Sequence, residues 1–249
     1  MGAAGHAQYS LDDPVVVDFP LRGEGWLAVT TPATRVPSHG VDVLGQTYAY
    51  DFLQVDGRPG GHVSPAGGLR GNLVGVRARD CYAWGAPVHA PCDGVVVRAV
   101  DGMAEREWIH PVREFTRMTW NGLTFTPARL GAIMGNHVLL KLDASPRGAG
   151  STDAARDVFA GFAHLQPGSV SVSAGQRVRT GELLGRVGHT GNSTSPHLHF
   201  QLMDSADLLQ AHGIPCAFSA YEVQHGESWQ RVTDAVPSSR DRIRSVPDR

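Results

Sequence analysis

Short runs of apolar residues, separated by turn residues, dominate the second half of the chain. They lie at 135–142, 158–165, 181–187 and 198–203, and Gly, Pro, Ser, Asn or Asp residues flank them. Runs of this length with such boundaries are typical of β-strands, because helices show longer segments with a period near 3.6. An Asp-Gly pair between two apolar runs also predicts a hairpin over 85–97. The pattern therefore predicts a mainly β fold built from an antiparallel sheet.

The first third and the end of the chain are less regular. Short strands are expected at 15–17 and 26–29, where they form an outer edge of the sheet. Residues 204–228 look irregular, and the polar residues after them look like a frayed tail. The chain is thus expected to contain an N-terminal edge segment, one main domain with two long loop insertions, and a polar C-terminal tail. Their bounds are 1–35, 36–228 with insertions 53–80 and 101–134, and 229–249.

The two insertions differ in character. The first is rich in glycine, and the second carries aromatic and arginine residues. A helical turn or two is expected within 105–117. Long loops in compact domains are often functional, so the aromatic residues either wall a binding groove or pack into the core. The sequence leaves both alternatives open.

Composition narrows the class of protein. The 249 residues carry a net charge of −2 and include 30 Gly and 16 Pro, which suits turns and short strands and gives no basic footprint for nucleic acid. Three cysteines at unrelated spacings, Cys81, Cys92 and Cys216, favour free thiols over a disulfide framework. No run is long and apolar enough for a transmembrane segment, and the first ten residues lack the features of a signal peptide. By sequence alone the chain is expected in the cytoplasm.

The candidate chemistry lies at His197-Leu198-His199, which a Gly/Ser/Thr/Asn-rich turn precedes. On a strand, residues i and i+2 point to the same face, so both imidazoles leave the strand in parallel. Leu198 points the other way, into apolar packing. Two such imidazoles suit a metal site, or a ligand beside an acid–base residue. A polar strand facing solvent is the alternative that this short motif leaves open.

A longer set of residues around this motif carries a family resemblance. The set comprises Phe162-Ala163-His164-Leu165, Gly168-Ser169-Val170, Gly175-Gln176-Arg177-Val178, Gly181-Glu182-Leu183-Leu184-Gly185, Thr190-Gly191-Asn192-Ser193 and Pro196-His197-Leu198-His199-Phe200. It resembles the lysostaphin-type zinc metallopeptidases, the M23 family. The resemblance implies a sheet of the lysostaphin or duplicated-hybrid-motif kind, and zinc-dependent hydrolysis of peptide bonds. It further implies peptidoglycan stem or cross-bridge peptides as substrate, and hence a location in the cell envelope.

The resemblance also implies a set of metal ligands, although this chain departs from the usual pattern. Most members have a His and an Asp four residues apart, whereas His39 and Asp42 are three apart. Some members resemble the arrangement here, with a Ser-His pair, a variable loop and a Tyr-Ala-x-Asp-Phe strand. Alternation along 48–52 places Asp51 on the face opposite the aromatic residues, where it can meet a metal. We therefore expect His39, Asp51 and His199 to bind zinc, with Asp42 as the competing ligand.

The two remaining histidines of the resemblance, His164 and His197, are expected to be catalytic. The chain has no HExxH motif, so no thermolysin-type glutamate can serve as the base, and histidine must take that role. Simple alternation along 158–165 predicts that His164 shares a face with Phe162. Of the other histidines, His89 and His137 are expected to be structural strand residues. His62 and His189 are expected on the surface, with substrate contact as the alternative for His189, and His212 and His225 are expected to play no part in the site.

Two other classes of function compete with a peptidase. Some M23 relatives keep the fold, lose ligands and regulate other cell-wall enzymes, so a non-catalytic binding or activator module is the main alternative. A sugar-phosphotransferase carrier shares a related β-architecture with paired histidines. Asp51 and the Pro-His-Leu-His-Phe sequence argue against the carrier. Metal content separates a peptidase from an activator module.

Overall fold

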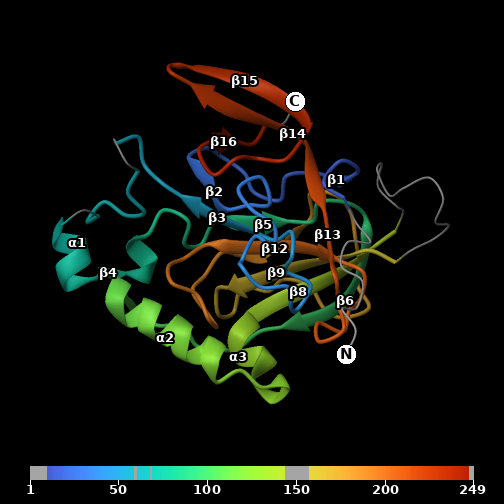
Figure 1. Cartoon of the computed structure of the whole chain (residues 1–249), viewed down its shortest axis with the longest axis horizontal. Coiled ribbons are helices and arrows are strands. Elements are labelled where there is room, and N and C mark those ends of the chain that lie inside the picture. Colours follow the sequence, from blue (N-terminus) through green and yellow to red (C-terminus); the bar gives the residue numbers. More distant parts are fainter. Residues whose placement is uncertain (1–9, 59–60, 68, 144–156, 247–249) are drawn as a thin grey trace, which may run out of the picture.

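One large β-sheet organises the chain in the computed structural model, which describes residues 10–58, 61–67, 69–143 and 157–246 (Figure 1). The sheet has twelve strands, and ten of them follow one another across it. Their order is β1 (Val15–Val17), β14 (Cys216–His225), β16 (Arg242–Arg244), β2 (Trp26–Thr30), β3 (Tyr50–Gln54), β12 (Leu198–Met203), β9 (Phe159–Leu165), β8 (Asn136–Leu142), β6 (Gly94–Val100) and β10 (Arg177–Val178). Only the β1–β14 pair of these is parallel. The expected mainly β, mostly antiparallel fold is confirmed.

The predicted hairpin over 85–97 is wrong. The strands on either side of the Asp93-Gly94 turn do not pair with each other: β5 (Pro87–His89) pairs with β11 (Leu183–Arg186), whereas β6 pairs with β8 and β10. The Asp93 carboxylate accepts hydrogen bonds from the backbone and hydroxyl of Thr180, at 2.8 and 2.9 Å. The Asp93-Gly94 pair therefore connects strands of two different sheets, and the Asp93 side chain bonds the distant turn at Thr180.

The C-terminal tail is also more ordered than its polar composition predicts. Strands β13 (Gly213–Ile214), β14 and β15 (Ser228–Ala235) occupy the region expected to be irregular or frayed, and β16 follows them. β15 pairs only with β14 and is exposed at most positions, so it lacks the apolar alternation by which a half-buried strand is recognised. β16 lies between β14 and β2, where Ile243 is fully buried. The proposed domain bounds themselves stay a prediction.

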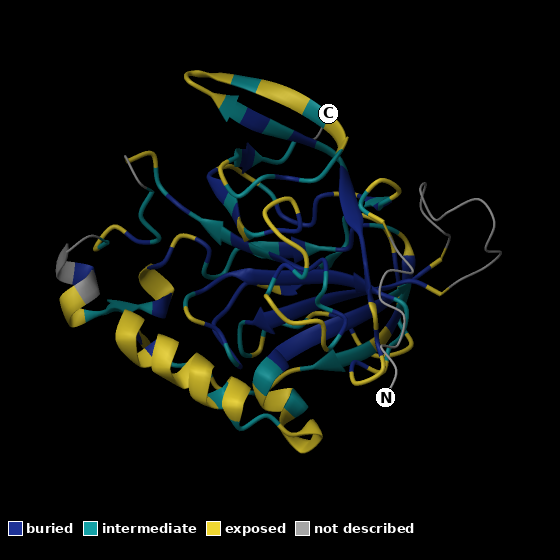
Figure 2. Cartoon of the chain, in the orientation of Figure 1, coloured by how far each residue is buried: buried dark blue, intermediate teal, exposed yellow. Residues whose placement is uncertain are grey.

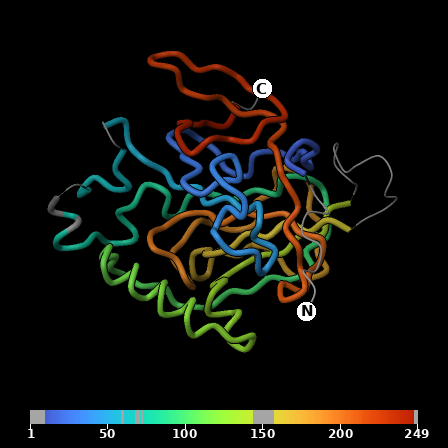
Figure 3. Tube along the Cα trace, in the orientation of Figure 1, coloured from blue at the N-terminus to red at the C-terminus, as the bar shows by residue number. Residues whose placement is uncertain are grey.

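Strands from the first and the last parts of the described chain lie side by side. Figure 3 shows the blue N-terminal strands against the red C-terminal ones, and strand pairing agrees: β1 pairs with β14, and β2 with β16. β1 ends the row of strands as expected, whereas β2 lies within the sheet between β16 and β3. The N-terminal segment therefore contributes to the interior of the sheet as well as to its edge.

Helices are confined, within the described residues, to the two insertions. They are α1 (Leu69–Val74), the 3-10 turn η1 (Ala78–Asp80), α2 (Pro111–Leu123), the 3-10 turn η2 (Pro127–Arg129) and α3 (Leu130–Met134). A short ribbon of β4 (Val76–Arg77) and β7 (Trp108–Ile109) joins the two insertions. α2 starts at Pro111, where the missing N–H of proline costs nothing. Figure 2 shows that α2 is exposed along most of its length, and none of the described helices is long and apolar enough to cross a membrane.

Aromatic packing on one face of the sheet fixes the strands that carry the candidate site. Phe52 of β3, Phe162 of β9 and Phe200 of β12 are all fully buried in one cluster. The Phe162 and Phe200 ring centroids lie 5.4 Å apart, and Phe218 lies 5.8 Å from both Phe200 and Phe52. Such rings contribute large buried areas, so this packing sets which residues of β3, β9 and β12 face the other way.

Candidate metal centre

Two neighbouring strands place a carboxylate and an imidazole opposite each other. Asp51 of β3 is the register partner of His199 of β12. Leu198 and Phe200 are fully buried in the aromatic cluster, so alternation directs His199 to the opposite face, as the sequence predicts. His199 Nδ1 lies 2.9 Å from Asp51 Oδ1.

The third member of this group comes from a loop. His39 Nε2 lies 3.0 Å from Asp51 Oδ2, and the backbone N–H of Ser38 bonds the carbonyl of Thr47 at 2.8 Å. That bond ties the His39 loop to the segment leading into β3. One ligand-type atom from each of His39, Asp51 and His199 falls within 4.8 Å of the others. The structure thus brings together the three residues expected to bind metal.

This donor set fits a divalent metal such as zinc. Two imidazoles and one carboxylate are a ligand combination that zinc uses in hydrolases, with a further position left for water or substrate. The second ring nitrogen of each histidine is also held: His39 Nδ1 by Ser38 Oγ at 3.1 Å, and His199 Nε2 by Gln201 Oε1 at 2.8 Å. Metal-binding histidines are typically oriented through such an outer hydrogen bond.

The competing residue Asp42 lies outside this group. It is exposed, and its carboxylate accepts a hydrogen bond from the Thr47 hydroxyl. A contact of this kind is typical of an aspartate that stabilises a turn, here the turn after Gly40.

His164 and His197 lie beside the group. Their ring centroids are 4.8 Å apart, and His197 Nε2 lies 3.4 Å from Asp51 Oδ1. Each Nδ1 atom meets a backbone carbonyl: Thr190 O at 3.0 Å for His164, and Ser195 O at 2.7 Å for His197. A carbonyl can only accept, so the network assigns the proton of each neutral ring to Nδ1. The Nε2 atom of each neutral ring then carries a lone pair.

The ionisable side chains of this region shift one another's pKa values. Burial alone would raise the pKa of Asp51, but the nearby His39 and His197 rings and hydrogen bonds from His197 and His199 lower it well below its usual range. Burial lowers the pKa of His164, and the neighbouring His197 and His199 lower it further. His197 behaves oppositely: burial would lower its pKa, but the Asp51 carboxylate raises it. The two rings therefore differ in how readily they hold a proton.

His164 reaches this face through an unusual backbone conformation. Simple alternation would place it beside Phe162 in the aromatic cluster, and that expectation is wrong. His164 has a φ of 63°, in the left-handed region, and the pairing of β9 with β8 shifts register between Asn136 and Val138. This irregularity interrupts the alternation and directs the His164 ring toward His197 and His199. Leu165 returns to the aromatic cluster.

A groove of about 840 Å³ runs from the group of three toward the insertions. His39 and Asp51 line one part of it, and Ile109, Phe115 and Met118 line another. Phe115 is 62% exposed, and Trp108 and Trp120 are exposed too, so the aromatic residues of the second insertion are not core residues. His62, expected to be an ordinary exposed histidine, is half-buried and lines the same groove.

The interpretation of His189 as a surface residue is wrong. Its side chain is completely buried, and it bonds Ser193 and Arg106. Burial, reinforced by the positive charge of Arg106, lowers its pKa to about 3. No local pattern connects Arg106 with this turn, since 83 residues separate it from His189. Of the other histidines, His89 lies in β5 and bonds Gly181 O at 2.9 Å, whereas His137 in β8 is buried.

Comparison with solved structures gives low similarity. The catalytic domain of lysostaphin from Staphylococcus simulans is 16% identical, with a TM-score of 0.36, over 82% of this chain and 90% of that one. A zinc containing peptidase from Vibrio cholerae is 18% identical, with a TM-score of 0.37, over 81% of this chain and 39% of that one. The chain therefore spans well under two thirds of the Vibrio cholerae protein. At these identities and scores, the likeness does not extend to function.

A family model gives the more specific result. The model of peptidase family M23 matches residues 151–211, the segment that holds His164, His197 and His199. Proteins of this family are generally zinc metallopeptidases. Residues 151–211 of this chain therefore belong to peptidase family M23.

Proposed function

We propose that this protein is a zinc metalloendopeptidase that hydrolyses peptide bonds, with peptidoglycan stem or cross-bridge peptides as its substrate class. His39, Asp51 and His199 would hold the metal, and His164 and His197 would be the catalytic residues. The observation that carries the proposal is the convergence of the three candidate ligands beside two histidines whose Nδ1 atoms are both engaged by carbonyls. Family membership supplies the reaction type.

When bound, the metal would act as a Lewis acid that polarises the peptide carbonyl and makes a water molecule more acidic. The remaining chemistry belongs to the protein. Because Nδ1–H of each ring faces a carbonyl, the neutral rings of His164 and His197 offer Nε2 as the proton acceptor. A proton taken from the attacking water at Nε2 would pass to the amine nitrogen as the C–N bond breaks. As imidazolium, the second ring can stabilise the oxyanion.

The groove supports an extended substrate. It joins the candidate metal centre to an apolar wall made by Ile109, Phe115 and Met118, and polar side chains such as Thr194 and Ser195 lie along it. A peptide laid along this groove would place a carbonyl near Asp51 and an apolar side chain against α2. Concave sites with mostly apolar walls and a few polar groups are typical of ligand-binding clefts.

Alanine substitutions at the two proposed catalytic histidines test the function. His164→Ala and His197→Ala should each retain zinc and fold but lose activity by about 10²–10⁴-fold, the usual contribution of acid–base residues. His212→Ala is the matched control, because His212 is exposed and its ring bonds only Asp204 among the contacts of the described residues. Turnover of purified cell-wall fragments and of glycine-rich peptides, with bound zinc measured on the same preparations, gives the comparison.

Two results would contradict the proposal. Parent rates in both alanine variants would remove histidine from the mechanism. A zinc-loaded parent protein that cleaves neither substrate would favour the non-catalytic binding or activator module.

A further inference from the structure

We propose that Arg106 is a positioning residue: with Glu114 behind it, it fixes the turn 188–197 and thereby the ring orientation and tautomer of His197. This inference rests on the proposed peptidase function for its kinetic consequence, but not for its structural one. Arg106 and Glu114 belong to the second insertion, outside the segment that matches the family. The insertion would therefore act on catalysis without touching the substrate at these residues.

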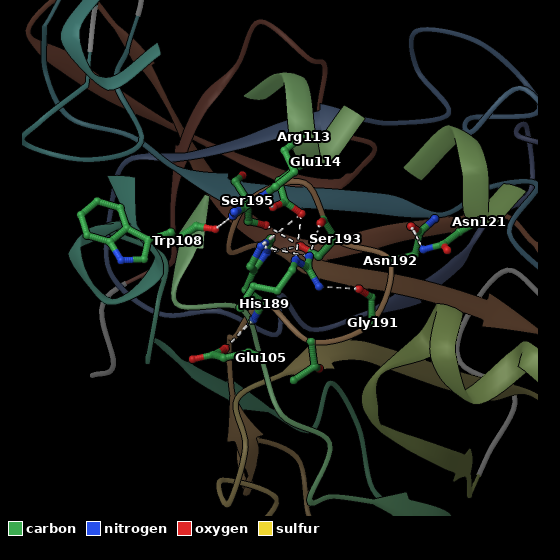
Figure 4. Close-up of polar contacts among 12 residues, drawn as sticks. Glu105, Trp108, Arg113, Glu114, Asn121, His189, Gly191, Asn192, Ser193 and Ser195 are labelled. Atoms are coloured by element: carbon green, nitrogen blue, oxygen red, sulfur yellow. Dashed lines mark hydrogen bonds and ion pairs between the residues drawn. The ribbon is translucent and has the colours of Figure 1, made fainter. Parts of the chain in front are cut away.

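Arg106 lies at the centre of a buried polar cluster. Its Nε donates to Glu114 Oε2 at 2.8 Å, and its Nη1 donates to Gly191 O at 3.1 Å. Its Nη2 donates to Ser193 O at 2.7 Å and to His189 Nε2 at 3.0 Å. Figure 4 shows Glu114, His189, Gly191 and Ser193 gathered around these contacts. Glu114 is 1% exposed and is the only buried residue of α2, so the helix contributes a charge to the interior where an apolar side chain would be usual.

A series of hydrogen bonds connects Arg106 to His197, and the donor and acceptor of each bond can be assigned. Guanidinium only donates, so His189 Nε2 must accept, and the proton of the neutral ring is then on Nδ1. His189 Nδ1 lies 3.0 Å from Ser193 Oγ and donates to it. The Ser193 hydroxyl donates to Ser195 O at 2.7 Å, which leaves only lone pairs on Oγ for other neighbours.

His197 is the last group in this series of hydrogen bonds. Its Nδ1 lies 3.2 Å from Ser193 Oγ and 2.7 Å from Ser195 O. Both atoms can only accept here, so Nδ1 of His197 must carry the proton, and Nε2 of the neutral ring must carry the lone pair. The hydrogen bonds that Arg106 donates therefore support, by way of His189 and Ser193, the same His197 tautomer that Ser195 O requires, with Nε2 able to take a proton.

The same turn also holds His164, through Thr190 O, and the second insertion anchors it at further points. Glu105 Oε2 accepts from the backbone N–H of His189 at 2.9 Å, and Asn121 Nδ2 donates to Asn192 Oδ1 at 2.9 Å (Figure 4). The backbone N–H of Asn192 also bonds Ile133 O at 2.9 Å. These contacts leave the turn little freedom, and Arg106 is the one that bonds two of its carbonyls together.

Lysine cannot replace arginine at this position without loss. The four acceptors around Arg106 match the planar fork of a guanidinium, whereas an ammonium group is a single point with three donors on a flexible stem. Arg106→Lys keeps the positive charge next to Glu114 but cannot bond Gly191 O, Ser193 O and His189 in the same geometry. The substitution therefore tests the geometry of the Arg106 contacts with the charge held constant.

The experiment compares Arg106→Lys with Arg129→Lys in the zinc-loaded protein. Arg129 lies in the same insertion, is exposed, and its guanidinium bonds only Thr124 among the contacts of the described residues. Arg106→Lys should lower kcat about 10- to 100-fold, the usual effect of losing a residue that orients a site, with KM and bound zinc nearly unchanged. Arg129→Lys should keep the parent values. In ¹⁵N NMR spectra of the histidine rings at alkaline pH, His197 should change from Nδ1–H in the parent to a mixture of tautomers in Arg106→Lys.

The ring spectra separate the failure of this inference from the failure of the peptidase proposal. They need no substrate, and the parent protein alone must show Nδ1–H at both His189 and His197. Nε2–H at His197 in the parent would overturn the inference even if Arg106→Lys failed to fold. An Arg106→Lys variant with parent kcat and an unchanged His197 tautomer would overturn it as well. A parent protein with the predicted tautomers but no hydrolysis would contradict the peptidase proposal without contradicting the positioning role of Arg106.

Discussion

At the scale of single residues, the backbone conformation of His164 decides where its side chain lies. A φ of 63° is costly for any residue with a Cβ, and residues held there tend to lie at functional sites. Here the conformation takes the ring out of the aromatic cluster and brings it to 4.8 Å from the His197 ring, centroid to centroid. The energetic cost at this position is offset by packing elsewhere in the sheet, where Phe162 and Leu165 on either side are fully buried.

This conformation predicts a difference between two substitutions. Asn tolerates the left-handed region, whereas a β-branched residue does not. His164→Val should therefore be about 1–2 kcal/mol less stable than His164→Asn, although both lose the imidazole. Denaturant unfolding of the two variants measures the difference. Equal midpoints and slopes would mean that the backbone relaxes to an ordinary strand conformation.

At the residue scale, alternation along a strand predicted side-chain direction correctly where the strand is regular. The alternation of Leu198, His199 and Phe200 correctly separated the His199 ring from the core, and the same argument correctly turned Asp51 away from its aromatic neighbours. It failed at His164, because alternation assumes a regular strand. The surface position predicted for His189 is wrong too, because the partner that buries this ring, Arg106, is distant in the sequence.

At the scale of elements, α2 has two faces with different roles. Glu114 is turned into the interior, whereas Phe115 and Met118 line the groove. Its other large apolar side chains, such as Val112, are exposed without lining the groove. The sequence predicted a helical turn or two within 105–117 but not a helix of 13 residues. The apolar positions of α2 do follow a helical spacing, but they lie on its exposed face, and the residue that the helix buries is Glu114.

The groove wall on α2 predicts a selective effect on substrate binding. Phe115→Ala should raise KM about 5- to 30-fold, corresponding to one or two kcal/mol, for a peptide with a bulky apolar residue next to the scissile bond. It should leave KM for a glycine-only peptide, kcat and bound zinc unchanged. Val112→Ala is the control, because Val112 is 66% exposed on the same helix and does not line the groove. Equal effects of the two substitutions, or of Phe115→Ala on both peptides, would exclude a pocket for apolar side chains at α2.

Strand pairing shows why other elements were predicted less well. The Asp93-Gly94 turn has the local signature of a hairpin, but pairing was decided by β8 and β11, which come much later in the chain. β15 pairs with one neighbour only and is exposed at most positions, so its sequence is polar although its backbone is extended. Local patterns predict extended structure better than they predict partners, because partners depend on distant segments.

At the scale of the whole molecule, the candidate metal centre unites segments that are far apart in the sequence. His39 comes from a loop, Asp51 from β3 and His199 from β12, and only the sheet brings β3 and β12 together. The segments meet because the aromatic cluster on the opposite face fixes both strands. Twelve residues separate His39 from Asp51, and the loop between them carries Asp42, the one carboxylate that spacing alone could favour.

Zinc content after substitution of the two aspartates tests the central claim most directly. Asp51→Ala and Asp42→Ala remove equivalent side chains, twelve and three residues after His39. The parent protein and Asp42→Ala should each hold one zinc per chain after reconstitution and dialysis, measured by elemental analysis. Asp51→Ala, with its fold checked by circular dichroism, should hold almost none. Zinc retained by Asp51→Ala and lost by Asp42→Ala would contradict the account.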